Sequence, residues 1–172
     1  MAFDNEQHSI AKSAIAALAV TIAMLVAAGF MPLFEPETIE QRLTIVAVAF
    51  ASLSLALARD IGRLANHRFA EPLDRNAAAA ETRTPHADML SAILRNTHEQ
   101  VTFAALVYAI AGIALPPHWT DAIMGCALLF LIGRLIFAAG YAKGAGGRAF
   151  GFGLTFYPGA ALALLTAIAA LV

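Results

Sequence analysis

A run of polar and ionisable side chains occupies positions 95–100, directly before a mostly apolar segment at 101–110. Its members are Arg95, Asn96, His98, Glu99 and Gln100. No glycine or proline separates the two segments, so one helix is predicted to carry both. A charge costs about 2.5–3.5 kcal/mol at the centre of a membrane helix, and ionisable groups there usually mark functional sites. Asn96 and Glu99 are expected on the same helix face.

The composition is that of a polytopic membrane protein. Of the 172 residues, 60% are hydrophobic and 13% are charged, whereas soluble domains have roughly 45–50% and about 25%. The net charge of −1 predicts no nucleic-acid partner. The single cysteine, Cys126, excludes an internal disulfide and a cysteine-based metal site. We expect an all-α integral membrane bundle that forms a single domain over residues 1–172, without a metal.

Five membrane-spanning helices are predicted from the apolar runs. Their expected ranges are 14–34, 43–58 with an end near Arg59 or Arg63, 85–115, 119–141 and 148–172. A cleaved signal peptide is the alternative for the first run, but the acidic segment before it and its length favour a retained helix. Thr84 and Pro85 suit the cap and first position of the third helix.

The distribution of basic residues predicts the orientation. Most Arg and Lys residues lie in a polar segment at 59–88 and in a glycine-rich loop at 142–147 with the adjoining Arg148. By the positive-inside rule these segments face the cytoplasm, as does the N-terminus, and the C-terminus lies outside. We expect a multi-pass protein of a bacterial inner membrane.

Polar residues from three helices are expected to meet in one layer. At about 1.5 Å per residue, Glu99 lies roughly 24 Å and Arg134 roughly 22 Å from the outer helix ends. They are predicted to form a buried ion pair, with Asn96, Tyr141 and Arg148 near the inner surface. Each residue also has a structural interpretation. Asn96 can join two helices, Tyr141 can lie in the interfacial belt, Arg134 can extend to the headgroups, and Lys143 and Arg148 can be topology charges.

These residues resemble a known family. Asn96-Thr97-His98-Glu99 on one helix, then Gly133-Arg134, Gly140-Tyr141-Ala142-Lys143 and Arg148, are similar to the MAPEG family, the membrane-associated proteins of eicosanoid and glutathione metabolism. The resemblance covers about Leu43 to Val172, which makes a four-helix unit at 43–172 and leaves 14–34 as an extra helix. Ala149 stands where a prostaglandin synthase has serine, so general glutathione chemistry is expected here.

The resemblance implies a homotrimer with a glutathione site between subunits, open to the cytosol. It implies that Asn96 and Glu99 contact glutathione, that Arg134 and Tyr141 line the pocket, and that Arg148 activates the thiol. Arg95 lies beside the motif asparagine and is included as a further contact.

The residue types suit this chemistry independently of the family. A permanently charged arginine favours the thiolate. Arg134, Lys143 and Arg148 can match the two carboxylates of glutathione, and Glu99 its ammonium. The predicted function is a membrane-bound glutathione transferase or peroxidase, in which the thiolate of glutathione as cosubstrate attacks a lipophilic electrophile that arrives through membrane lipid. The alternatives are a non-enzymatic membrane scaffold and a small transporter, each using an intramembrane Glu–Arg pair.

Overall fold

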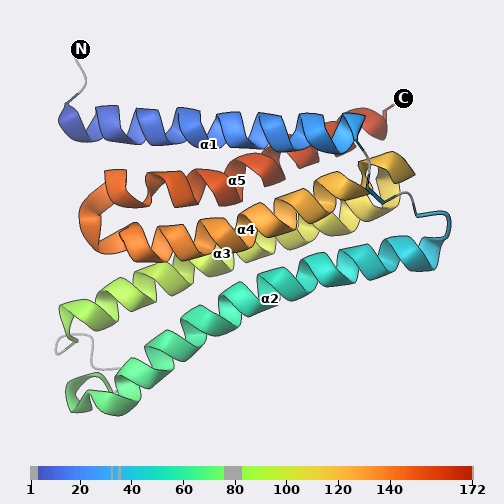
Figure 1. Cartoon of the computed structure of the whole chain (residues 1–172). Coiled ribbons are helices and arrows are strands. Elements are labelled where there is room, and N and C mark those ends of the chain that lie inside the picture. Colours follow the sequence, from blue (N-terminus) through green and yellow to red (C-terminus); the bar gives the residue numbers. More distant parts are fainter. Residues whose placement is uncertain (1–3, 32, 35, 76–82, 172) are drawn as a thin grey trace.

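The computed structural model describes residues 4–31, 33–34, 36–75 and 83–171. Its long elements are α1 (Asn5–Phe30), α2 (Ile39–Ala70), α3 (Pro85–Ala114), α4 (Thr120–Gly140) and α5 (Gly144–Ala169) (Figure 1). Short 3-10 turns follow α2 and connect the later helices: η1 (Pro72–Asp74), η3 (Pro117–Trp119) and η4 (Tyr141–Lys143). The described part contains no strand, so the all-α prediction is confirmed.

Local sequence explains where several helices begin and end. Asp4 and Thr38 each form a capping box with the glutamine three residues later, at the starts of α1 and α2. Thr84 caps α3 through the Ala87 N–H, and Pro85 occupies its first turn. The helix ends at Leu115, directly before two prolines. Both ends of α3 were therefore predicted correctly.

Within the part of the chain that the structure describes, three helical segments are long and apolar enough to cross a membrane: Asn5–Phe30, Ile39–Ala70 and Pro117–Ala169, the last of which contains α4 and α5. α3 is not among these segments, because its first half is polar, although it runs alongside the other helices (Figure 1). The chain is thus an integral membrane helical bundle.

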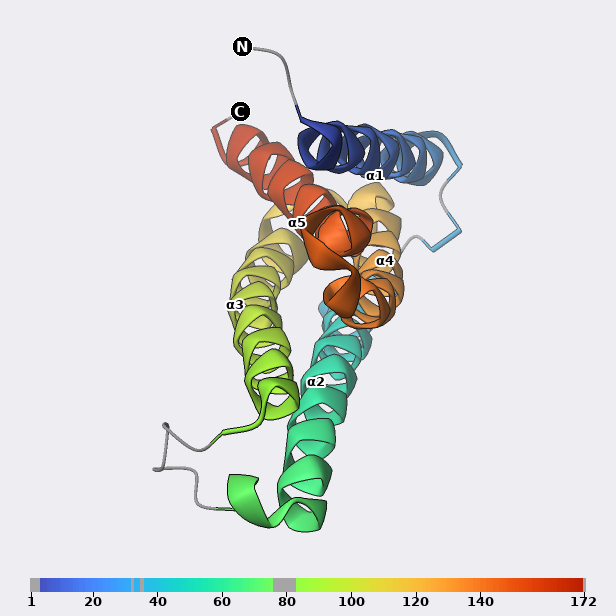
Figure 2. The ribbon, with the colours of Figure 1, turned by 90° about the vertical axis from the view of Figure 1, so that its left-hand side faces the viewer.

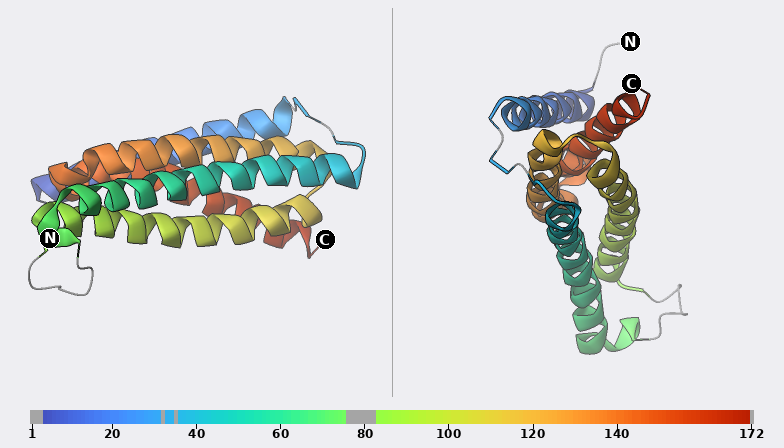
Figure 3. Two further views of the ribbon diagram at one scale, coloured as in Figure 1. Left: turned by 90° about the horizontal axis from the view of Figure 1, so that it is seen from below. Right: turned by 90° about the vertical axis from the view of Figure 1, so that its right-hand side faces the viewer.

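The helices alternate in direction along one long axis. α5 packs between α1 and α4, and α2 packs against α3 and α4 (Figures 2 and 3). The start of α1, the end of α2, the start of α3 and η4 all lie at one end of the bundle (Figure 1). The largest buried apolar side chains of the core come from α3, α4 and α5, among them Tyr108, Phe130 and Leu162.

Glycines bring the backbones of α4 and α5 together. A Cβ on Gly140 would collide with the carbonyl of Gly147, and one on Gly133 would lie 2.9 Å from the carbonyl oxygen of Gly151. Such small residues let membrane helices approach closely. Gly147, in the glycine-rich segment after α4, therefore makes room for the backbone of α4.

Several predicted boundaries were wrong. α1 spans Asn5–Phe30 instead of 14–34, because the Asp4 capping box starts the helix within the polar N-terminal segment. α2 begins at Ile39 instead of 43, directly after the Thr38 cap. α2 continues to Ala70 instead of ending between Ala58 and Arg63, because Arg59, Asp60 and His67 find hydrogen-bond partners within the protein. α5 begins at Gly144 instead of Arg148, because Gly144 makes the turn in one residue with a φ of 82°. Part of the predicted polar segment, residues 76–82, lies outside the described residues.

A hydrogen-bonded cluster connects η1 to the start of α3. The Asp74 carboxylate accepts from the Thr84 hydroxyl at 2.5 Å, from the Thr84 N–H at 2.9 Å, and lies 2.8 Å from Nε2 of His67. The hydroxyl hydrogen bond from Thr84 is the main cause that holds the pKa of Asp74 below its usual value. The end of α2 and the start of α3 are thereby fixed relative to one another.

Candidate functional site

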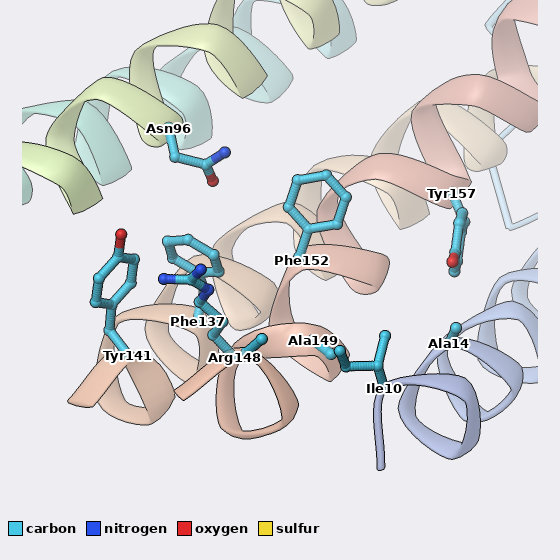
Figure 4. Close-up of a pocket in the computed structure, with 10 residues that line it drawn as sticks. Ile10, Ala14, Asn96, Phe137, Tyr141, Arg148, Ala149, Phe152 and Tyr157 are labelled. Carbon is cyan, nitrogen blue, oxygen red and sulfur yellow. The ribbon is translucent and has the colours of Figure 1, made fainter. Parts of the chain in front are cut away.

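A cavity of about 420 Å³ opens at the end of the bundle that holds η4. It lies between α3, the turn from α4 to α5, and α1. Its polar side chains are Asn96, Tyr141, Arg148 and Tyr157. Asn96 points into it from α3 and the Tyr141 hydroxyl points toward α3 from the facing turn, while Ile10 and Ala14 of α1 lie beyond Arg148 (Figure 4). Three residues singled out from the sequence, on three different elements, therefore meet in one cavity.

Arg148 is held against an aromatic ring. Its guanidinium carbon lies 4.4 Å from the centroid of Tyr141, and the Tyr141 ring packs edge-on against Phe137 at 5.4 Å. Cation–π contact of this kind orients the guanidinium without using its hydrogen-bond donors. Within the described residues, no ion pair involves Arg148. Its charge and its donors are therefore available to an anionic ligand in the cavity.

Asn96 is held by a buried cation. Its Oδ1 accepts a hydrogen bond of 2.9 Å from Nη1 of Arg134. Nη2 of Arg134 donates to the Thr97 hydroxyl at 2.7 Å, and its guanidinium lies 4.1 Å from the Phe137 ring centroid. Arg134 is completely buried. It does not line the cavity, and it acts on the site by fixing the amide of Asn96.

An acidic partner that was not predicted balances this cation. Thr97 donates 2.6 Å to the carboxylate of Asp60, which is 2% exposed. Arg59 also donates to that carboxylate, at 2.8 Å, and to the backbone carbonyl of Arg134, at 3.2 Å. A buried charge is stable only when it is paired and hydrogen-bonded. The sequence analysis included Asp60 in the polar cytoplasmic segment at 59–88, and recognition that α2 extends to Ala70 would have placed it on this helix.

The predicted ion pair between Glu99 and Arg134 was wrong. Asn96 and Thr97 take the two terminal nitrogens of Arg134, and Nε of Arg134 has no partner among the described residues. Glu99 is exposed. It shares the helix face of Asn96 and of Phe103, whose ring packs against Phe156 of α5. Glu99 therefore lies on the side of α3 that faces α5, near the cavity and outside the buried network.

Two other predicted contacts lie outside this cavity. Lys143 is exposed on η4. Arg95 lines a separate open groove between α2 and α3, together with His98 and Arg68. One chain alone does not bring Arg95 to Arg148. The described residues contain no group of three or more His, Cys, Asp or Glu side chains able to hold a metal ion.

A sequence model of the MAPEG family matches residues 43–168, which extends from α2 to α5 and covers most of the chain. The match contains Asn96, Arg134, Tyr141 and Arg148, and it excludes α1. No curated protein and no solved structure matches the chain significantly.

Proposed function

The chain belongs to the MAPEG family, and we propose that it is a membrane-bound enzyme that activates the thiol of glutathione for attack on a lipophilic electrophile. The family is one of membrane proteins of glutathione and eicosanoid metabolism. One observation carries the narrower proposal: the Arg148 guanidinium, stacked on Tyr141, shares a cavity with the amide of Asn96.

Arg148 has the chemistry to stabilise a thiolate. A free thiol has a pKa of about 8.5 and is mostly protonated at neutral pH. A guanidinium keeps its charge, so it favours the anionic sulfur and lowers that pKa. The Tyr141 ring holds Arg148 in place, and the Tyr141 hydroxyl is a second donor at the same cavity. Arg148 is therefore the proposed catalytic residue.

The remaining predicted residues take peptide-binding roles in this proposal. The Asn96 amide oxygen is used by Arg134, which leaves its N–H groups for a carbonyl or carboxylate of glutathione. Lys143, at the cavity end of the bundle, suits a carboxylate and Glu99 suits the ammonium. Arg134 positions Asn96 from outside the cavity.

The proposed active unit is a homotrimer. Glu99 and Arg95 are exposed in one chain, which supports a site completed where α3 of one subunit meets a neighbouring subunit. The cavity lies at the end that carries η1 and η4, and this end is proposed to face the cytoplasm of a bacterial cell, where glutathione is dissolved. The electrophile enters from the lipid.

In the transferase reaction, the thiol proton leaves to solvent and the sulfur forms a bond to an electrophilic carbon, whose leaving group departs. In the peroxidase reaction, the sulfur takes the terminal oxygen of a hydroperoxide and releases the alcohol. A second glutathione then forms the disulfide and water. The same thiolate is the nucleophile in the transferase and the peroxidase reactions.

The scaffold and transporter alternatives relied on a Glu99–Arg134 pair, which does not form. The test is the thermal stability of the purified protein in detergent with glutathione, because a ligand of the native state raises it by about 2.7 kcal/mol at a hundred times its Kd. Free cysteine, which has the thiol without the tripeptide, is the control ligand. Stabilisation by glutathione, together with conjugation of a model electrophile, supports the proposal. Absence of both would contradict it.

A further inference from the structure

α1 lies outside the family match, yet it forms one side of the cavity. Ile10 and Ala14 line the cavity opposite Tyr141. They are four residues apart and therefore share a helix face, and Figure 4 shows both on the far side of Arg148 from Asn96. The polar side of the cavity comes from the matched helices, and this apolar side comes from α1.

α1 is closely packed on both sides of these two residues. Before them, a Cβ on Gly146 of α5 would lie 2.7 Å from the Ser9 hydroxyl. After them, a Cβ on Gly153 would lie 2.6 Å from the Cβ of Ala17, which is fully buried. These glycines leave room for α1 at both points. Ile10 and Ala14 are thus held at a defined position relative to α5.

The first turn of α5 is also connected to α1. Oε1 of Glu6 accepts a hydrogen bond of 3.1 Å from the Ala145 N–H. α5 has no side-chain cap from its own N-cap residue, Lys143, and the first N–H groups of a helix otherwise lack partners. Glu6 supplies a partner and places a negative charge at the positive end of the helix. Because Arg148 lies one turn further along α5, this contact aligns α1 with the helix of the proposed catalytic arginine.

We infer that α1 is the specificity-determining wall of the active site, with Ile10 and Ala14 contacting the apolar body of the electrophile while its reactive atom meets the thiolate near Arg148. The inference rests on the proposed function and deepens it. The ligand class is an electrophile with an apolar chain or ring, because the wall offers only aliphatic carbon. Glutathione itself is expected to bind on the polar side and not to depend on this wall.

The first test compares affinities of S-methylglutathione and S-hexylglutathione, which differ only in the apolar group on sulfur. The variants are Ile10→Ala, which removes the wall contact, and Ala14→Leu, which fills the space. Ile15→Ala is the matched control, since Ile15 is 69% exposed on the outer face of α1. Both wall variants are expected to lower the hexyl-to-methyl affinity ratio by about tenfold, with glutathione affinity unchanged. A hexyl-to-methyl affinity ratio equal to that of the parent in both variants would contradict the proposed role of α1.

A second test does not need glutathione binding. Ile10→Cys and Ile15→Cys are treated with N-hexylmaleimide, and the adducts are followed by mass spectrometry; the native Cys126 is buried. If the wall binds the hexyl group, the rate of adduct formation at position 10 should saturate as the maleimide concentration rises. The rate at position 15 should increase linearly with that concentration. A linear dependence of the rate on reagent concentration at both positions would contradict the proposed role of α1. If glutathione does not bind the parent protein, the proposed function is wrong. The maleimide measurement then still tests separately whether Ile10 lies in a site that binds an apolar group.

Discussion

Arg134 donates to the Oδ1 of Asn96 across 2.9 Å, so a completely buried cation on α4 orients an amide that α3 presents to the cavity. From the sequence, Glu99 was expected to pair with Arg134, because Glu99 is a charged residue on the same helix face as Asn96. The amide is the better partner here since it brings no second charge into the cavity wall, while Asp60 balances Arg134 through Thr97.

The buried network should be sensitive to loss of its carboxylate. Asp60→Asn leaves Arg134 and Arg59 without a balancing anion, and removal of one member of a buried charge network costs about 3–5 kcal/mol. Thermal unfolding in detergent measures the loss. The control is Asp88→Asn, because the Asp88 side chain is 63% exposed and its ion pair with Arg83 is 3.9 Å long. Equal stability of Asp60→Asn and the parent would show that the network contributes nothing.

Arg148→Ala should raise the thiol pKa of bound glutathione by about one unit or more, because an adjacent cation shifts a pKa by about 1–3 units. Conjugation near neutral pH should fall on the order of tenfold, whereas binding should weaken less because Asn96 and Tyr141 remain. Arg148→Lys should recover part of the rate, since it keeps the charge without the planar fork. Thiolate absorbance against pH, beside conjugation rates, checks this.

The control for that series is Arg75→Ala, which removes an exposed arginine whose Nη2 donates to the carbonyl of Phe69. An Arg148→Ala complex with the parental thiol pKa would remove Arg148 from thiol activation.

The Asp74 cluster should make stability depend on pH in the acidic range. The pKa of Asp74 is lowered in the folded protein, chiefly by the Thr84 hydroxyl, so the unfolded chain binds this proton more tightly. The stabilisation is fully present above the unfolded value of about 3.9 and is lost as the pH falls through the folded value. Asp74→Asn should flatten the stability curve below about pH 4, as measured by thermal unfolding; a slope identical to that of the parent would refute this.

Glu6→Ala should destabilise the contact between α1 and α5 modestly. A carboxylate at a helix N-terminus contributes about 0.3–1 kcal/mol, so a small fall in Tm is expected. Glu6→Gln keeps the acceptor oxygen for the Ala145 N–H and should lose less. Glu37→Ala removes an exposed carboxylate elsewhere and is the control. A Tm of Glu6→Ala equal to that of Glu37→Ala would show that the cap does not stabilise the helix.

Orientation in the membrane is testable with reporter fusions. A reporter after Val172 should be active outside, and one inserted near Arg75 should be active in the cytoplasm, because the basic residues gather at the end of the bundle that holds η1 and η4. A cytoplasmic reporter at the C-terminus would reverse the orientation, and would place the cavity on the outer side.

The sequence alone determined the class of the protein and its local structure. Apolar runs and few charges define a membrane bundle, and Thr84, Pro85 and Leu115 define the ends of α3, because capping and proline geometry act within a few residues. The chemistry-bearing side chains Asn96, Tyr141 and Arg148 were also recognisable, since polar groups at membrane depth are costly and therefore conspicuous.

Tertiary structure decided which of these residues meet. Helical periodicity assigns a residue to a face, but close packing between helices decides what that face contacts. Gly140 and Gly147 bring α4 onto α5 only because each lacks a side chain at the same point. That approach places Arg148 over Tyr141, while the packing of α2 against α3 and α4 gives Arg134 its distant partner, Asp60, and leaves Arg95 in a separate groove.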